Sequence, residues 1–273
     1  MSDNKKQQVA PTVQPTQPAG IITMQPGIYQ QALFPIEIIE TYPSNEGTAD
    51  LTTIGKGQNS KHYAIKRISD GNGFVPASEF FCYELARHVS IATPDYDYLS
   101  LPKTEIAFGS VWEGGVHSLN KNNDVIDILE NTVIVDDLER FFGKVYAFDL
   151  FVNNEDRHFG NYIFRESFGK TKIALAFDFS RAWKETDPFG YSCLQSDTRT
   201  KECHEAIKDY GRFDHAAALD TLEKIRAIDK EIIVSIMENM HSSWMSKSEK
   251  KVIIDWWGSE PFHERIDKLK GVI

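Results

Sequence analysis

The chain has 273 residues, enough for one large or two small domains with a hydrophobic core. Hydrophobic residues make up 41% and charged residues 26%, which is ordinary for a globular protein. The formal net charge of −10 argues against a nonspecific grip on nucleic acid or on an anionic membrane surface.

The cysteines and the hydropathy pattern favour a cytoplasmic protein. Cys82, Cys193 and Cys203 form neither a CxxC pair nor a zinc-ligand spacing, so we expect reduced thiols. Cys82 lies in an apolar helical pattern and is expected in the core. No apolar run approaches the length of a membrane span, and the N-terminus lacks a hydrophobic signal core. We therefore expect no membrane partner.

Residues 1–28 are rich in Gln, Pro, Thr and Ala, a composition that buries too little apolar surface to offset the entropy of ordering. We expect a disordered tail there. From about Phe34 the residue pattern changes, and alternating β-branched residues predict three antiparallel strands that form a small sheet. The expected strands are 36–40, 50–54 and 62–68, with turns at 42–49 and 55–60.

The next elements alternate between helical and strand patterns. Ser78 is a candidate N-cap for an amphipathic helix over 79–89, whose acidic first turn suits the helix dipole. Pro94 ends this helical region, and 103–112 returns to strand texture. Glu113-Gly114-Gly115 then breaks the pattern. Beyond it most of the chain is helical in periodicity, with helices expected at 136–152, 216–228 and 231–240.

The stretch from Asn154 to Asn161 contains residue types that phosphoryl transfer from ATP requires. Asp156 precedes Asn161 by five positions, and this short spacing lets one loop aim both oxygens into a common site. Asp178 comes seventeen residues after Asn161, at the end of the buried-strand pattern 173–177. Asp156 would orient or deprotonate an acceptor hydroxyl, and the other two would hold magnesium. Each residue alone would more often cap a turn, but the ordered set favours a kinase-type site.

Lys66 ends the strand pattern Tyr-Ala-Ile-Lys, where a kinase strand lysine would contact the α- and β-phosphates of ATP. In isolation such a lysine is more often simply solvated. A carboxylate on the following helix should pair with it, and Glu79 and Glu84 both qualify. Arg157 either binds a phosphorylated residue or acceptor or pairs with a carboxylate, and His158 is more often a packed, hydrogen-bonded histidine than a catalytic one.

The nucleotide contacts made by backbone groups leave weaker signals. No Gly-x-Gly-x-x-Gly motif is present, but segment 44–49 lies between the first two expected strands, where a phosphate loop belongs. Gly47 would let the backbone approach the phosphates and Thr48 would donate a hydrogen bond, although an ordinary hairpin fits equally well. A hinge that pairs with adenine, or a plain strand-ending turn, is expected at Val111, Trp112 and Glu113.

These motifs resemble those of the HipA-like kinases, especially the short, single-module forms, over about residues 35–260. The resemblance rests on Lys66, Ser78-Glu79 opening a helix through Leu85-Ala86, Phe108-Gly109-Ser110 with Trp112-Glu113-Gly114-Gly115, Phe148-Asp149 before Asn154-Glu155-Asp156-Arg157, and Asp178. The pattern Asp-Arg-His-x-x-Asn followed by Asp-Phe is also similar to phosphatidylinositol kinases, which share this atypical kinase fold.

The resemblance implies an α+β, two-lobed protein-kinase-like fold, with a small antiparallel-sheet N-lobe and one helix over 29–113 and a mainly helical C-lobe over 114–273. It implies an enzyme that uses ATP and Mg²⁺ to phosphorylate Ser or Thr of a protein. Some relatives are toxins, so an antitoxin-like regulatory partner is a further expectation. The matched roles are base for Asp156, metal ligands for Asn161 and Asp178, and phosphate contact for Lys66 with Glu79 behind it.

The sequence departs from the family pattern at Ser180, where many kinases have glycine after Asp-Phe. The chain is also shorter than full-length HipA-type toxins, so we expect their extra N-terminal domain to be missing. In HipA-like kinases a phosphate-loop serine can be autophosphorylated, and Ser44 and Thr48 are the candidates in this sequence. One alternative is a lipid or small-molecule kinase, and the acidic net charge argues against a lipid substrate. The other is a nucleotide-binding pseudokinase that acts as a binding module.

Overall fold

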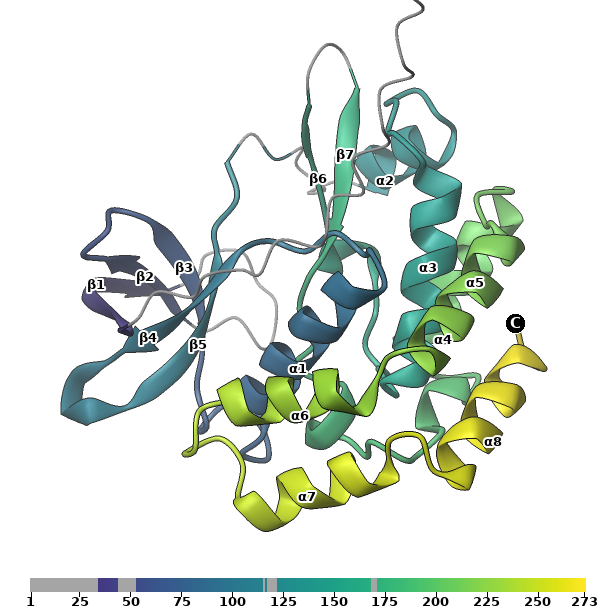
Figure 1. Ribbon diagram of the computed structural model, residues 1–273. Helices are drawn as coiled ribbons and strands as arrows, with labels where there is room; N and C mark the ends of the chain where they lie inside the picture. Colours follow the sequence, from purple (N-terminus) through teal and green to yellow (C-terminus); the bar gives the residue numbers. More distant parts are fainter. Residues whose placement is uncertain (1–33, 44–52, 115, 117–121, 168–170) are drawn as a thin grey trace, which may run out of the picture.

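The computed structural model describes residues 34–43, 53–114, 116, 122–167 and 171–273 (Figure 1). Within these ranges the chain contains seven strands and eight α-helices, which confirms the predicted α+β class. The expected tail over 1–28 lies outside the described residues, and so do Ser44, Gly47 and Thr48 of the expected phosphate loop.

The N-terminal strands form one sheet that closes on itself in the order β1-β2-β3-β5-β4. Its strands are β1 (Ile36–Pro43), β2 (Thr53–Gly57), β3 (His62–Lys66), β4 (Tyr96–Ser100) and β5 (Ile106–Val111). The three predicted strands pair antiparallel as expected, and only the closure of the sheet, a short parallel pairing of β1 with the unpredicted β4, departs from the antiparallel prediction. The turn predicted at 55–60 is also displaced, because β2 continues through Gly57.

A small apolar core fills the interior of this sheet, and it explains why the sequence pattern does not predict β4. The buried residues are Ile38, Tyr63, Ile65, Leu99, Leu101 and Ala107. On β4 the polar Asp97 is buried as well, where it accepts a hydrogen bond from the Tyr63 hydroxyl (2.8 Å). Since Tyr96 and Asp97 are both buried, β4 lacks the alternation of apolar and polar residues by which a half-buried strand is predicted.

Helix α1 (Val75–His88) crosses from the sheet to the helical part of the molecule (Figure 1). Its N-cap residue is Phe74, with a proline in the first turn, so the prediction of Ser78 as N-cap is wrong. Ser78 is instead buried inside the helix, where its hydroxyl accepts a hydrogen bond from the Glu185 N–H (2.9 Å). Glu79 consequently lies beyond the first helical turn and faces the interior.

The remaining elements are mostly helical (Figure 1). They are α2 (Asn122–Leu129), α3 (Leu138–Phe151), α4 (Arg199–Asp209), α5 (His215–Arg226), α6 (Lys230–Asn239), α7 (Lys247–Trp256), α8 (Glu260–Lys270), a hairpin of β6 (Tyr162–Glu166) and β7 (Lys172–Ala176), and 3-10 turns at Pro102–Thr104, Phe159–Asn161, Trp183–Glu185 and Ser192–Leu194. Each predicted helix in this part matches α3, α5 or α6 within two residues at both ends.

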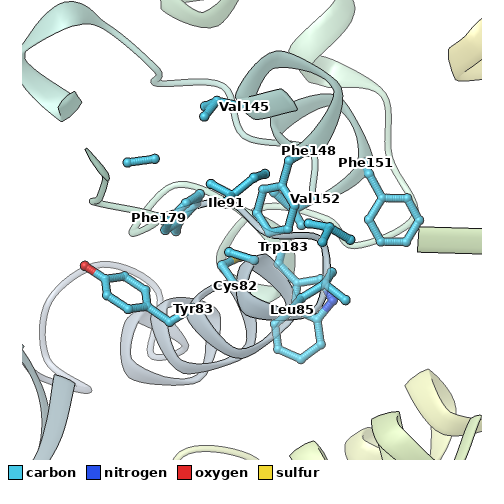
Figure 2. Packing of buried hydrophobic residues seen from close by; sticks show 14 of the residues in the cluster. Cys82, Tyr83, Leu85, Ile91, Val145, Phe148, Phe151, Val152, Phe179 and Trp183 are labelled. Carbon is cyan, nitrogen blue, oxygen red and sulfur yellow. The ribbon is translucent and has the colours of Figure 1, made fainter. Parts of the chain in front are cut away.

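The main core joins α1 to α3 (Figure 2). Figure 2 shows Phe179 and Trp183 inserted between these two helices, and Phe179 packs edge-on against Tyr83 of α1 and Phe148 of α3. Cys82 is buried in this core, as predicted, and all three cysteines are free thiols. No helix in the described part of the chain is both long and apolar enough to cross a membrane.

Candidate active site

The predicted lysine, glutamate and second aspartate meet in one buried cluster. Lys66 Nζ, at the end of β3, lies 3.0 Å from Asp178 Oδ1 and 3.8 Å from Glu79 Oε1. It also donates a hydrogen bond to the Ser180 hydroxyl (2.8 Å). The structure therefore selects Glu79 as the partner on the helix, because Glu84 pairs with Arg87 at the far end of α1.

Asp178 is held in position by its neighbours along the chain. It stands two residues beyond β7 with a φ of 58°, in the left-handed region that aspartate tolerates better than most residues. The buried ring of Phe179 anchors the following residue in the core. Ser180 contacts Asp178 Oδ1 through its backbone N–H (3.3 Å) and through its hydroxyl. A glycine at position 180 would lack that hydroxyl contact.

The two carboxyl groups in the cluster have opposite pKa shifts. Burial raises the pKa of Glu79 to about 7, an effect that the Lys66 ammonium only partly offsets. Burial also acts to raise the pKa of Asp178, but the closer Lys66 ammonium and the Ser180 hydrogen bonds outweigh it and lower the pKa to about 2. Asp178 is therefore a carboxylate at neutral pH, as a magnesium ligand must be.

Asp156, the expected base, lies in the loop between α3 and β6, in contact with two arginines. Arg199 Nη1 is 3.3 Å from Asp156 Oδ1, and Arg181 Nε is 3.7 Å from Asp156 Oδ2. The Asp156 backbone carbonyl accepts a hydrogen bond from Asn161 Nδ2 (2.9 Å), which fixes the length of the loop between the two predicted residues. Neither arginine was predicted, because both lie more than 20 residues from Asp156 along the chain.

Asn161 carries the feature that best fits a metal ligand. Its side-chain oxygen, Oδ1, is buried and has no hydrogen-bond partner in the structure. A buried polar atom is normally paired, so an unpaired oxygen is open to an ion, a ligand or a water. The Asn161 carbonyl accepts from the Phe177 N–H (3.2 Å), so the strand-like pairing sets Asn161 beside the residue that precedes Asp178.

The donor set of Asn161 and Asp178 suits magnesium better than a metal that is held by the protein alone. In the described part of the chain, no group of three or more His, Cys, Asp or Glu side chains could hold a metal ion. One amide oxygen and one carboxylate are the kind of set that Mg²⁺ accepts, since it keeps several waters and takes its other ligands from substrate phosphates.

A buried ion pair organises the loop. Arg157 donates to both carboxylate oxygens of Asp149 on α3, at 2.8 and 3.0 Å, and to the carbonyls of Asn161 (3.0 Å) and Phe177 (2.6 Å). Burial alone would lower the pKa of Arg157, but Asp149 more than offsets this and raises the pKa. Arg157 is therefore the carboxylate partner rather than an acceptor-binding group. His158 accepts from the Gly160 N–H (3.1 Å), a local packing role.

The expected hinge lies at the end of β5. The Val111 N–H donates to the Asp95 carbonyl (2.7 Å) and the Trp112 N–H donates to the His62 carbonyl (2.8 Å). The Glu113 carboxylate lies 3.5 Å from Arg165 Nε. The N–H groups of Val111 and Trp112 are therefore already paired within the sheet.

A cavity of about 330 Å³ opens beside Ser180, on the side of the cluster that leads to Asp156. Its walls include Asp70 and Gly71 from the β3–α1 loop, Glu155 and Arg181 from the neighbourhood of Asp156, and Glu185. Glu185 accepts from the Asn72 N–H and, through Oε2, from the Phe74 N–H (2.8 Å). It thereby ties the start of α1 to the segment that follows Asp178.

Comparison with known proteins identifies the fold. Neither a scan against protein-family models nor a search of curated proteins finds a match. Among solved structures, the Helicobacter pylori proinflammatory kinase CtkA matches with a TM-score of 0.50 and 18% identity, over 81% of this chain and 90% of that chain. The chain has the fold of this kinase. The kinase-type fold that the motifs indicate is therefore confirmed.

A second similar structure is that of the HipA, HipB and operator DNA complex from the toxin–antitoxin system of Shewanella oneidensis MR-1. It matches with a TM-score of 0.47 and 11% identity, over 88% of this chain and 68% of that chain. Fold likeness at such identities leaves the activity to be argued from the site itself.

Proposed function

We propose that this chain is a kinase that transfers the γ-phosphate of ATP, with Mg²⁺, to a Ser or Thr hydroxyl of a protein. The observation that carries the proposal is the unpaired, buried Oδ1 of Asn161, set beside the Asp178 segment while Lys66 contacts Asp178. Buried polar atoms are usually paired, and an oxygen left without a partner suits a ligand of a hydrated cation on phosphates.

Each side chain then has a defined task. Lys66, backed by Glu79, would bind the α- and β-phosphates, and Asn161 with Asp178 would hold the cation. The cation held by these two residues would supply positive charge that offsets the negative charge of the phosphates. Asp156 would accept a hydrogen bond, and finally the proton, from the acceptor hydroxyl, so that the attacking oxygen points in line at the γ-phosphorus.

We also propose the division that the sequence suggests, with residues 29–113 as the N-lobe and 114–273 as the C-lobe. The site then lies between them, since Lys66 and Glu79 come from the first part and Asp156, Asn161 and Asp178 from the second. The backbone of 111–113 is proposed to bind adenine, and Gly47 and Thr48 to lie over the phosphates.

The test is phosphate transfer by the full chain. Purified protein is mixed with ³²P-labelled ATP, Mg²⁺ and a protein lysate, and labelled phosphoamino acids are identified after hydrolysis. Wild type is expected to label Ser or Thr, and Asp156→Asn to lose nearly all transfer while it still binds nucleotide. No transfer by wild type, or equal transfer by the variant, would refute the proposal.

Other outcomes of the same assay favour the alternatives. Label in the organic phase would identify a lipid kinase, and label on a small metabolite a small-molecule kinase. Nucleotide binding without turnover would identify a binding module. An antitoxin-like partner stays a prediction from the sequence resemblance, and purification of the tagged chain from its native cells would test it.

A further inference from the structure

Two exposed arginines converge on the carboxylate that is expected to act as base. Arg199 approaches one oxygen of Asp156 (3.3 Å) and Arg181 approaches the other (3.7 Å). Their side chains are 60% and 52% exposed, whereas that of Asp156 is 17% exposed. The guanidinium groups are therefore accessible from solvent, and the carboxylate lies beneath them.

Exposed ion pairs of this kind add little to stability, so holding Asp156 in place does not by itself account for two of them. The loop is already fixed by Asn161 Nδ2, which donates to the Asp156 carbonyl, and by the buried Arg157–Asp149 pair. Lys66 already supplies a positive charge for the nucleotide phosphates. The two exposed guanidinium groups thus place positive charge on the side of Asp156 that an acceptor hydroxyl must approach.

The end of helix α4 adds positive potential at the same place. Arg199 is its first residue, and Thr200 joins the helix to the loop, donating its N–H to the Glu155 carbonyl (3.3 Å) and accepting from the Arg157 N–H (2.9 Å). The N-terminus of a helix carries a partial positive charge. In a chain with a net charge of −10, an anionic substrate segment needs such a local positive region to approach.

We propose that Arg181 and Arg199 form a binding site for an anionic side chain of the acceptor, a carboxylate or a phosphate next to the Ser or Thr that receives the phosphoryl group. The inference rests on the proposed function. When an acidic acceptor segment binds, its anion takes over the guanidinium groups from Asp156. This exchange frees the Asp156 oxygens for the acceptor hydroxyl. An acidic residue next to the acceptor therefore strengthens substrate binding and also makes the base accessible.

The geometry limits how far this anion is from the reacting hydroxyl. Both guanidinium groups lie within 4 Å of the oxygens that would hold that hydroxyl. A side chain one or two residues from the acceptor can reach them, since neighbouring Cα atoms are about 3.8 Å apart. Glu155 lies in the wall of the adjoining cavity and opposes such an anion. Removing the negative charge of Glu155 should therefore strengthen the binding of such an anion, whereas removing either arginine should weaken it.

The test measures peptide binding without nucleotide, by fluorescence anisotropy. Four labelled peptides share a central Ser and differ only in its neighbours, which are Glu, phosphoserine, Gln or Lys. Wild type should bind the Glu or phosphoserine peptide about tenfold more tightly than the Gln peptide, with an advantage that shrinks at high salt. Arg181→Gln and Arg199→Gln should each remove most of that advantage, and Glu155→Gln should increase it.

Arg226→Gln is the matched control, because Arg226 pairs with Asp267 on a distant surface between α5 and α8. It should leave the preference unchanged. The relative affinity for the Glu and phosphoserine peptides identifies which anion is preferred. Equal binding of all peptides by wild type, no binding of any of them, or an unchanged preference in both arginine variants would overturn the inference.

The outcome is separable from the phosphate-transfer assay. A chain that binds acidic peptides through these arginines but transfers no phosphate would refute the proposed function and leave the anion site. A chain that phosphorylates neutral and acidic peptides equally would do the reverse. If both arginine variants instead slow transfer to every peptide by the same factor, the arginines serve the transferred phosphate and the inference is wrong.

Discussion

Removing Arg157 should cost far more stability than removing an arginine whose ion pair is partly exposed. Its side chain is 2% exposed and that of Asp149 is fully buried, and the two share a bidentate pair at 2.8 and 3.0 Å. Arg157→Met leaves the Asp149 carboxylate buried without its cation. Breaking one side of a buried ion pair costs about 3–5 kcal/mol, so the free energy of unfolding should fall by that amount.

A second variant separates the loss of charge pairing from the loss of the loop contacts. Asp149→Asn combined with Arg157→Met removes both charges and keeps an acceptor for Asn154 Nδ2, which donates to Asp149 in the native protein (2.8 Å). We expect it to be more stable than Arg157→Met by about 2 kcal/mol. The double variant should still bind MgATP poorly, because the carbonyls of Asn161 and Phe177 have lost the Arg157 guanidinium as their shared donor.

Equilibrium unfolding in urea measures both stabilities, and titration with a fluorescent ATP analogue measures binding. Arg165→Met is the matched control, because Arg165 forms a partly exposed pair with Glu113 and should change stability by less than about 1 kcal/mol. A loss below about 1 kcal/mol in Arg157→Met, or a double variant no more stable than the single one, would contradict the argument from the buried pair.

Three further predictions concern Glu79, the loop before α1 and Asn161. The pKa of Glu79 is raised from 4.5 to about 7, so the contribution of Glu79 to stability is present below pH 4.5 and lost as the pH rises through 7. In urea titrations, the stability of wild type relative to Glu79→Gln should therefore fall between pH 5 and 8. Gly71→Ala should be less stable than Gly73→Ala by about 1–2 kcal/mol, because both positions have positive φ but only a Cβ at Gly71 meets Glu185. Equal losses of unfolding free energy in the two variants would show that the contact with Glu185 has no effect. Asn161→Ala should raise the Mg²⁺ concentration needed for ATP binding about tenfold or more, whereas Asn161→Asp, which keeps an oxygen ligand but loses the Nδ2 donor to the Asp156 carbonyl, should raise it by less.

Local patterns predicted the parts of the site that depend on neighbours in the sequence. Asp156 and Asn161 share one loop, and Asp178 follows a strand of apolar residues, so spacing and flanks were enough to bring them into one hypothesis. The helix α5 was predicted closely because its buried residues repeat with the helical period, whereas α3 is buried on nearly all sides and was predicted by the length of its apolar segment. The structure confirms these two helices and sets Asn161 beside the Asp178 segment.

Other features depend on contacts between distant segments, and no local pattern reports them. Ser78 has the residue type of an N-cap, yet its hydroxyl is used by Glu185, 107 residues away, and the helix begins three residues earlier. Glu185 was missed for the same reason, since a lone glutamate gives no sign that it binds the N–H groups at the start of α1. Arg181 and Arg199 reach Asp156 only after the chain has folded.

The resting arrangement of Lys66 has a consequence for the order of binding under the proposed function. Its ammonium lies closer to Asp178 (3.0 Å) than to Glu79 (3.8 Å), so the expected metal ligand is occupied by a cation of the protein itself. Nucleotide phosphates would compete for Lys66 and thereby free the Asp178 carboxylate. Because linkage is reciprocal, any change that releases the Asp178 carboxylate from Lys66 must also favour nucleotide binding. Under the proposed function, the phosphate and cation sites of this chain would therefore be coupled through Lys66, and Ser180, in contact with both Lys66 and Asp178, would take part in that coupling.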